Sequence, residues 1–193
     1  MKNNREYQKA LALLWSAVGP AAEFHAGQWE SIQVILNRKR LLVVQKTGWG
    51  KSMVYFVATK LLREQGLGPT IIISPLLSLM RNQYISAEKM NLKMITVNSD
   101  YSDRYAEYGQ KLGKNEVDLV ITTPEQLGKE DFNNHILSKT NIGLFVVDEA
   151  HCISDWGHDF RPHYRRITRI MTALPQTVPV LATMLPILPP TDW

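Results

Sequence analysis

Leu144 to Tyr164 reads LFVVDEAHCISDWGHDFRPHY, and this stretch decides the fold. The apolar run 144–147 predicts a buried strand of a parallel sheet. Two adjacent carboxylates, Asp148 and Glu149, follow at its carboxyl end. Two acids side by side disfavour each other's charged form, and a bound metal ion is the usual reason for such a pair. We therefore expect Asp148 to hold Mg²⁺ and Glu149 to orient a water molecule.

Aromatic and basic residues continue the same stretch: Trp156, His158, Phe160 and Arg161. The bases of a single-stranded nucleic acid stack on aromatic rings, and its phosphates attract arginine. Alternatively, Trp156 and Phe160 pack the loop against the sheet and Arg161 pairs with an acid. The residues alone leave both interpretations open.

Composition sets only broad limits. The chain has 193 residues, 45% of them hydrophobic, with a net charge of +4, which suits one domain with a basic surface or a nucleic-acid partner. The single cysteine, Cys152, excludes an internal disulfide and fits a reducing compartment. No signal-peptide core and no apolar run near the ~20 residues of a membrane span are present, so we expect a cytoplasmic protein without a membrane partner.

Strand and helix patterns alternate along the chain. Tyr7 to Val18 shows the spacing of an amphipathic helix, which Gly19 and Pro20 end. Strands are expected at 41–44, 70–74, 94–97, 119–122, 144–148 and 178–182, and further helices at 27–37, 51–64, 77–90, 103–112 and 162–174. Nearly continuous apolar strands between helices indicate an α/β fold, a three-layer α-β-α sandwich around a mainly parallel sheet.

A glycine-rich loop, QKTGWGKS at 45–52, lies between the first core strand and its helix, as a phosphate-binding loop requires. Gly48 and Gly50 would let backbone N–H groups approach phosphate oxygens beside the helix amino end. Lys51 would reach the β- and γ-phosphates, and Ser52 would ligate Mg²⁺.

Two features of this loop depart from the simple G-x-x-x-x-G-K-[ST] pattern. Gln45 replaces the first glycine, and Trp49 is bulky for a loop that wraps a ligand. The alternative is a glycine turn followed by a chance Lys-Ser pair. The acid pair at the end of another core strand argues against it.

Together these motifs resemble the RecQ family of DEAH-type superfamily 2 helicases over about 24–183. Residues 148–151 (DEAH) reproduce the DEAH box, and 152–164 resemble the family's aromatic-rich loop. Residues 24–28 (FHAGQ) resemble motif 0, whose glutamine recognises adenine, although the family usually has arginine at His25. ISPLLSLM (73–80) resembles motif Ia and TTPEQL (122–127) resembles motif Ib.

The resemblance implies a P-loop NTPase (RecA-like) domain that uses ATP and Mg²⁺. It implies catalytic roles for Lys51, Asp148, Glu149 and His151, with Mg²⁺ on Ser52 and Asp148. The implied ATP-binding residues are Phe24, Gln28, Thr47, Gly48, Trp49, Gly50, Lys51 and Ser52. The implied DNA contacts are Ser74, Pro75, Ser78, Arg81, Thr123, Pro124, Trp156, His158, Phe160 and Arg161.

Purely structural alternatives remain for several of these residues. Gln28 alone would be interpreted as a solvated helix glutamine, His151 as a core histidine, and Arg81 as a solvated helix charge. Cys152, His158 and His163 lack the paired spacing of a zinc site. The resemblance further implies a DNA-stimulated ATPase that moves 3′-to-5′ on single-stranded or partly duplex DNA in repair or recombination.

The end of the chain departs from the family. Where motif III, a Thr-Ala-Thr-like turn, is expected, 184–193 carries three prolines within five residues, which forbid a normal helix. We divide the chain into an N-terminal helical segment (1–23), a RecA-like domain 1 (24–183) and an atypical Pro-rich tail (184–193).

Turnover in such systems needs a second domain, whose arginine finger raises kcat by ~10³- to 10⁵-fold. We therefore expect a truncated or split first domain that needs a second RecA-like domain in cis or trans and cannot unwind DNA alone. The alternative is a catalytically inactive module that binds nucleotide, DNA or a partner.

Overall fold

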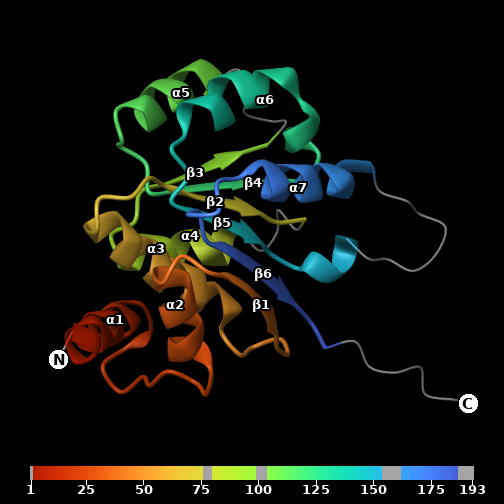
Figure 1. Cartoon of the computed structure of the whole chain (residues 1–193). Coiled ribbons are helices and arrows are strands. Elements are labelled where there is room, and N and C mark those ends of the chain that lie inside the picture. The colour runs from red at the N-terminus through yellow and green to blue at the C-terminus, as the bar shows by residue number, and fades with distance from the viewer. Residues whose placement is uncertain (1, 76–79, 99–103, 154–161, 187–193) are drawn as a thin grey trace, which may run out of the picture.

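The computed structural model describes residues 2–75, 80–98, 104–153 and 162–186 (Figure 1). Within them, one sheet has the strand order β1-β6-β5-β2-β4-β3, and every pairing is parallel. The strands are β1 (Arg40–Val44), β2 (Thr70–Ile73), β3 (Met94–Val97), β4 (Leu119–Thr122), β5 (Leu144–Val147) and β6 (Val180–Met184). The predicted parallel sheet is confirmed.

Helices cover both faces of this sheet. One face carries α1 (Lys2–Val18), α2 (Gln28–Leu36), α3 (Lys51–Glu64) and α4 (Met80–Lys89), which share one core cluster. The other carries α5 (Tyr105–Gly113), α6 (Glu130–His135) and α7 (Pro162–Ala173), which share a second. Neighbours along a strand alternate between clusters: Ile72 joins the first, whereas Ile71 and Ile73 join the second. The three-layer α-β-α sandwich is therefore confirmed, with α5, α6 and α7 above the sheet in Figure 1.

Two parts of the fold differ from the sequence prediction. The last strand was expected at 178–182, but β6 begins at Val180 and continues to Met184, because Thr183 and Met184 pair with Val43 and Val44 of the edge strand β1. The stretch between β4 and β5 also holds unpredicted structure: α6, η3 (Gln126–Gly128) and η4 (Leu137–Lys139). These elements are too short to show a helical period.

The N-terminal helix α1 packs on the same core as the sheet. Ala10, Leu14 and Ala17 are buried, and Tyr7 meets the rings of Phe24 and Trp29 at centroid distances of 6.0 and 5.2 Å. The division of the chain after residue 23 stays a prediction.

No described helix has the length and apolarity that crossing a membrane requires.

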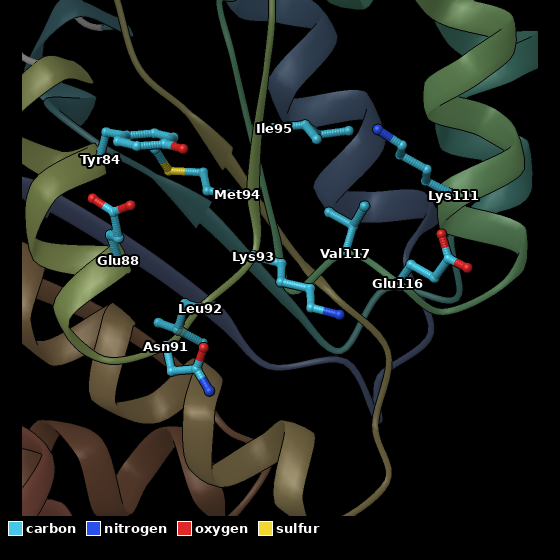
Figure 2. Close-up of a pocket in the computed structure, with 10 residues that line it drawn as sticks. All are labelled: Tyr84, Glu88, Asn91, Leu92, Lys93, Met94, Ile95, Lys111, Glu116 and Val117. Carbon is cyan, nitrogen blue, oxygen red and sulfur yellow. The ribbon is translucent and has the colours of Figure 1, made fainter.

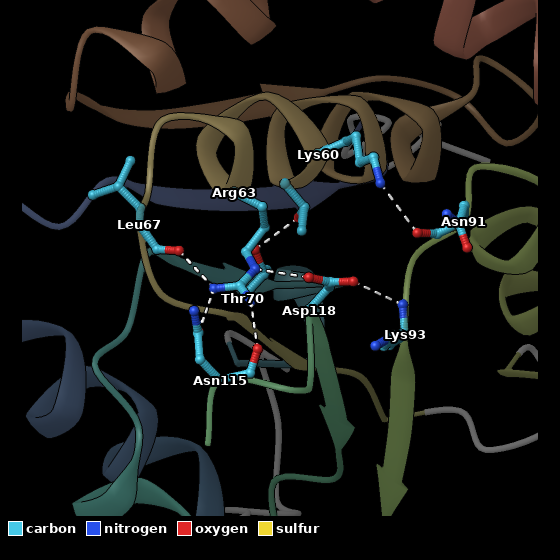
Figure 3. A network of polar contacts seen from close by, with 9 residues as sticks. Lys60, Arg63, Leu67, Thr70, Asn91, Lys93, Asn115 and Asp118 are labelled. Carbon is cyan, nitrogen blue, oxygen red and sulfur yellow. Dashed lines mark hydrogen bonds and ion pairs between the residues drawn. The ribbon is translucent and has the colours of Figure 1, made fainter. Parts of the chain in front are cut away.

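A polar network ties α3 to the amino ends of β3 and β4 (Figure 3). Arg63 Nε donates to Asp118 Oδ1 at 2.7 Å, and Arg63 Nη1 donates to the carbonyl of Leu67 at 2.7 Å and to Asn115 Oδ1 at 2.6 Å. Asp118 Oδ2 accepts the N–H of Lys93 at 2.9 Å. The side chains of Arg63 and Asp118 are only 12% and 17% exposed, so this pair is largely shielded from water.

Candidate nucleotide site

Three neighbouring strands bring the site together. β1, β6 and β5 lie side by side, and all point the same way. Their carboxyl ends therefore place the loop 45–50, Thr183 and the Asp148–Glu149 pair at one edge of the sheet. Ligands of open parallel sheets bind outside this edge.

The glycine loop has a backbone that side chains would disturb. Gly48 and Gly50 have φ angles of +85° and +87°, in the left-handed region that favours glycine. A Cβ at Gly50 would lie 2.6 Å from Gln28 Nε2, so a side chain at this position would displace the Gln28 amide. Gly50 also caps the amino end of α3, which begins at Lys51. The loop thus presents a helix amino end, where anions bind readily.

Lys51 meets the acid pair across the sheet edge. Its Nζ donates to the carbonyl of Gln45 at 3.2 Å and lies 3.6 Å from Glu149 Oε1. The other Glu149 oxygen lies 3.3 Å from His151 Nδ1. Glu149 has a φ of +51°, which is uncommon for a residue with a side chain and typical of functional turns. The structure therefore brings together three of the four predicted catalytic residues, with the Glu149 carboxylate between the other two.

Asp148, the fourth, is held by a residue that sequence reasoning missed. Thr183 Oγ1 donates to Asp148 Oδ1 at 2.6 Å, and the two residues are 1% and 6% exposed. Thr183 can reach Asp148 because β6 lies between β1 and β5. A threonine at the end of a core strand was the only sequence signal, and it had meaning only once the strand order was known.

The 24–28 loop lies against the glycine loop. Gln28 is 3% exposed, and its Nε2 donates to the carbonyls of Trp49 at 2.8 Å and Gly50 at 3.3 Å. A solvated helix glutamine is therefore the wrong interpretation. Phe24 is half-buried, stacked on Trp29 at a centroid distance of 6.2 Å. Thr47 and His25 are exposed.

The predicted DNA contacts lie partly at the same edge. Ser74 and Thr123 follow the neighbouring strands β2 and β4, and the N–H of Ser74 donates to the carbonyl of Thr122 at 2.9 Å. Both side chains are buried, and the Ser74 hydroxyl has no hydrogen-bond partner among the described residues. Pro75 and Pro124 sit beside them. Ser78, Trp156, His158, Phe160 and Arg161 lie outside the described residues, as does the side chain of Arg81 in α4.

A buried bond supports the loop after β4. Tyr105 OH donates to Gln126 Oε1 at 2.6 Å, and both residues are at most 3% exposed. Burial, with a contribution from Asp131, raises the pKa of Tyr105 above its ordinary value. The phenol therefore stays a donor and fixes η3 behind Thr123.

The residues at this edge fit a magnesium ion in chemistry. The Ser52 hydroxyl and the Asp148 carboxylate are the hard oxygen donors that Mg²⁺ takes, usually with several waters. A Glu149 oxygen is buried without a hydrogen-bond partner in the described part of the chain, although it faces His151. The described residues contain no cluster of three or more His, Cys, Asp or Glu that could hold a metal by themselves.

A groove of ≈ 550 Å³ lies far from this site, at the opposite edge strand β3 (Figure 2). Tyr84 and Glu88 of α4 form one wall, and Lys111 and Glu116 lie on the other. It shares no residue with the candidate nucleotide site, so we assign it no role in nucleotide binding.

A family model described as DEAD/DEAH box helicase matches residues 25–186. The chain belongs to this family. Among curated relatives, it is 34% identical to the ATP-dependent DNA helicase RecQ of Haemophilus influenzae, covering 92% of this chain and 28% of the relative. It is 37% identical to RecQ of Bacillus subtilis, covering 75% of this chain and 24% of that relative. Within the DEAD/DEAH box helicases, the chain is therefore a RecQ-type helicase domain, the first RecA-like domain, as predicted.

Other comparisons give one more relative and two solved structures of similar fold. The chain is 39% identical to the mouse bifunctional 3′-5′ exonuclease/ATP-dependent helicase WRN, over 83% of this chain and 11% of that protein. Its fold resembles the DUF1998 helicase MrfA bound to DNA and AMPPNP, with a TM-score of 0.66, 20% identity, and coverage of 96% of this chain and 26% of that one. It also resembles the Sulfolobus solfataricus SWI2/SNF2 ATPase core, with a TM-score of 0.59, 17% identity, and coverage of 87% and 32%. The chain spans about a quarter of the length of its bacterial RecQ relatives.

Proposed function

We propose that this DEAD/DEAH box domain binds Mg-ATP and single-stranded or partly duplex DNA, as the first RecA-like domain of a RecQ-type 3′-to-5′ helicase. The observation that carries the proposal is the meeting of Lys51 and Glu149. Lys51 opens helix α3 and Glu149 follows strand β5, and their side chains lie 3.6 Å apart beside a glycine-lined helix amino end. A cation and a carboxylate in this place suit phosphate binding and the activation of water.

Each residue at the carboxyl ends of β1, β6 and β5 has a role in this proposal. Lys51 exchanges Glu149 and the Gln45 carbonyl for the β- and γ-phosphates, because a phosphate carries more negative charge than either. Glu149, released from Lys51, orients the attacking water, and His151 keeps the second carboxylate oxygen in place. Bound Mg²⁺, held by Ser52 and Asp148, would neutralise charge that develops on the phosphates. Thr183 fixes the orientation of Asp148.

Nucleotide and DNA sites would communicate through adjacent strands. β5, which leads into the acid pair, is bonded to β2, which leads into Ser74, and β2 is bonded to β4, which leads into Thr123. Backbone groups at these two ends would hold DNA phosphates, which position a strand without reading its sequence. The hydroxyls of Ser74 and Thr123 are buried here and would join these contacts only once exposed. Such binding should weaken as salt rises, and an affinity for single-stranded DNA that ignored salt would contradict phosphate contacts.

A second RecA-like domain, in cis or in trans, would supply the other wall of the ATP cleft. Unwinding belongs to the assembled pair of domains, because translocation requires the cleft to open and close around ATP. We expect the domain alone to bind Mg-ATP and to hydrolyse it slowly.

The test is Mg-ATP binding and hydrolysis, with and without single-stranded DNA, by the wild-type chain and Glu149→Gln. Glutamine keeps the size of the side chain but cannot act as the carboxylate that orients water. We expect the variant to bind Mg-ATP within about twofold of wild type and to lose turnover. Turnover that survives the substitution would contradict the role of Glu149. Binding without turnover in both chains would instead support the inactive binding module.

A further inference from the structure

Trp49 takes the bulky place in the glycine loop, and its side chain is directed at the preceding loop. The indole Nε1 donates to the carbonyl of Ala26 at 3.2 Å. The ring also covers Gly27, where a Cβ would lie 3.6 Å from Trp49 Cζ2, and it packs on the first core cluster. The bulk of Trp49 is thus accommodated against the 24–28 loop.

Bonds also run in the opposite direction. Gln28 Nε2 donates to two carbonyls of the glycine loop, those of Trp49 and Gly50. The Gln28 Oε1 in turn accepts the N–H of His25 at 2.9 Å. We call these contacts between 24–28 and 49–50 the loop clasp. Each loop donates to the other, so neither shifts without breaking a bond made by its own side chain.

The clasp restrains a segment that contains two glycines. Gly48 and Gly50 flank Trp49, and glycine loses more backbone entropy on ordering than any other residue. A loop ordered before its ligand arrives spares that cost at binding. The indole hydrogen bond and the packing of the ring provide this order.

We propose that Trp49 is a positioning residue that sets the register between the 24–28 loop and the phosphate loop. The role rests on the proposed nucleotide function, in which one ligand touches both loops. A nucleoside triphosphate would depend on that register, because its base and its phosphates must fit simultaneously. Inorganic tripolyphosphate needs only the phosphate loop. Trp49 therefore contributes to the affinity for ATP beyond its effect on the phosphate loop alone.

The test substitutes Trp49→Phe, which keeps an aromatic ring and removes the indole N–H. Trp15→Phe is the matched control, because Nε1 of Trp15, a residue of α1, also donates to a backbone carbonyl, that of Ala22 at 2.9 Å. Loss of one neutral hydrogen bond corresponds to about a 2- to 10-fold change. We expect Trp49→Phe to weaken ATP binding by that factor and tripolyphosphate binding by less than about twofold. Equal losses for the two ligands would overturn the register role.

A second readout needs no nucleotide. The backbone N–H groups of His25 and Gln28 are hydrogen-bonded within the 24–28 loop. Their hydrogen exchange should accelerate about 2- to 10-fold in Trp49→Phe and stay unchanged in Trp15→Phe. Unchanged exchange in Trp49→Phe would refute the clasp, whatever the chain binds. Failure of the wild-type chain to bind ATP would refute the proposed function and the register role with it, while the exchange data would still measure the clasp.

Discussion

Thr183→Val removes the hydroxyl that holds Asp148 and keeps the branched shape of the side chain. The lost bond is 2.6 Å long, and both partners are nearly buried, at 1% and 6% exposure. A hydrogen bond to a charged group contributes about 1.5–3 kcal/mol. We therefore expect the free energy of unfolding to fall by about 1.5–3 kcal/mol. In a chain of this size each kcal/mol shifts Tm by about 2–4 °C, so Tm should fall by about 3–12 °C.

The assay is urea unfolding followed by circular dichroism, with Tm measured in parallel. Thr172→Val is the matched control, because Thr172 Oγ1 donates to the carbonyl of Thr168 at 2.9 Å on the exposed side of α7. That substitution should change stability by no more than about 0.5 kcal/mol. Thr183→Ser, which keeps a hydroxyl, should recover part of the loss. If Thr183→Val were as stable as the exposed control, the buried bond would not hold Asp148 as argued.

Three further predictions concern charges elsewhere in the fold. Arg63→Ala should lower the free energy of unfolding in urea by about 2–4 kcal/mol, since its 2.7 Å ion pair is largely buried. Lys9→Ala, in an exposed 2.6 Å pair, should lower it by at most about 0.5 kcal/mol. Equal losses in the two variants would refute the weight given to burial. Burial raises the pKa of Tyr105, so its neutral phenol contributes stability that is complete below about pH 10 and is lost as pH rises through the folded pKa. Tyr105→Phe should remove this alkaline decline in Tm. An unchanged decline in the variant would count against the role of the phenol. The hydrogen bond from Arg104, above all, lowers the pKa of Glu107 to about 2. Because the pair is exposed to water, the stability that it adds above pH 4.5 is small, and it is lost as pH falls toward 2. Glu107→Gln should therefore reduce the acid decline in Tm only slightly, and a large reduction would contradict the screening.

Sequence alone predicted the parts of the fold that local patterns determine. The runs 119–121 and 144–147 are continuously apolar and bounded by polar residues or glycine, so their strands were identified with nearly correct ends. The end of β6 was not, because Thr183 and Met184 become strand only by pairing with β1, a partner about 140 positions earlier. Pairing over such distances leaves no periodic signal in the sequence.

The candidate site shows the same division. Motif resemblance identified Lys51, Glu149 and His151, which the fold brings together. It did not identify Thr183, whose contact depends on strand order, or explain Trp49, whose bulk is taken up by the 24–28 loop. Gln28 was expected to face the base, and in the described chain its amide is used by the glycine loop. Base recognition by Gln28 would therefore require its amide to leave the glycine loop, and the bond between Trp49 and Ala26 would then hold the two loops in register.

The central claim is that Lys51 binds the phosphates of Mg-ATP, and calorimetric titration of Mg-ATP tests it most directly. Lys46→Ala is the control, because Lys46 is an exposed lysine of the same loop. A charge-assisted bond of about 1.5–3 kcal/mol predicts that Lys51→Ala weakens binding about 10- to 100-fold, and we expect Lys46→Ala to stay within about threefold of wild type. Equal affinities in Lys51→Ala and wild type would contradict the claim.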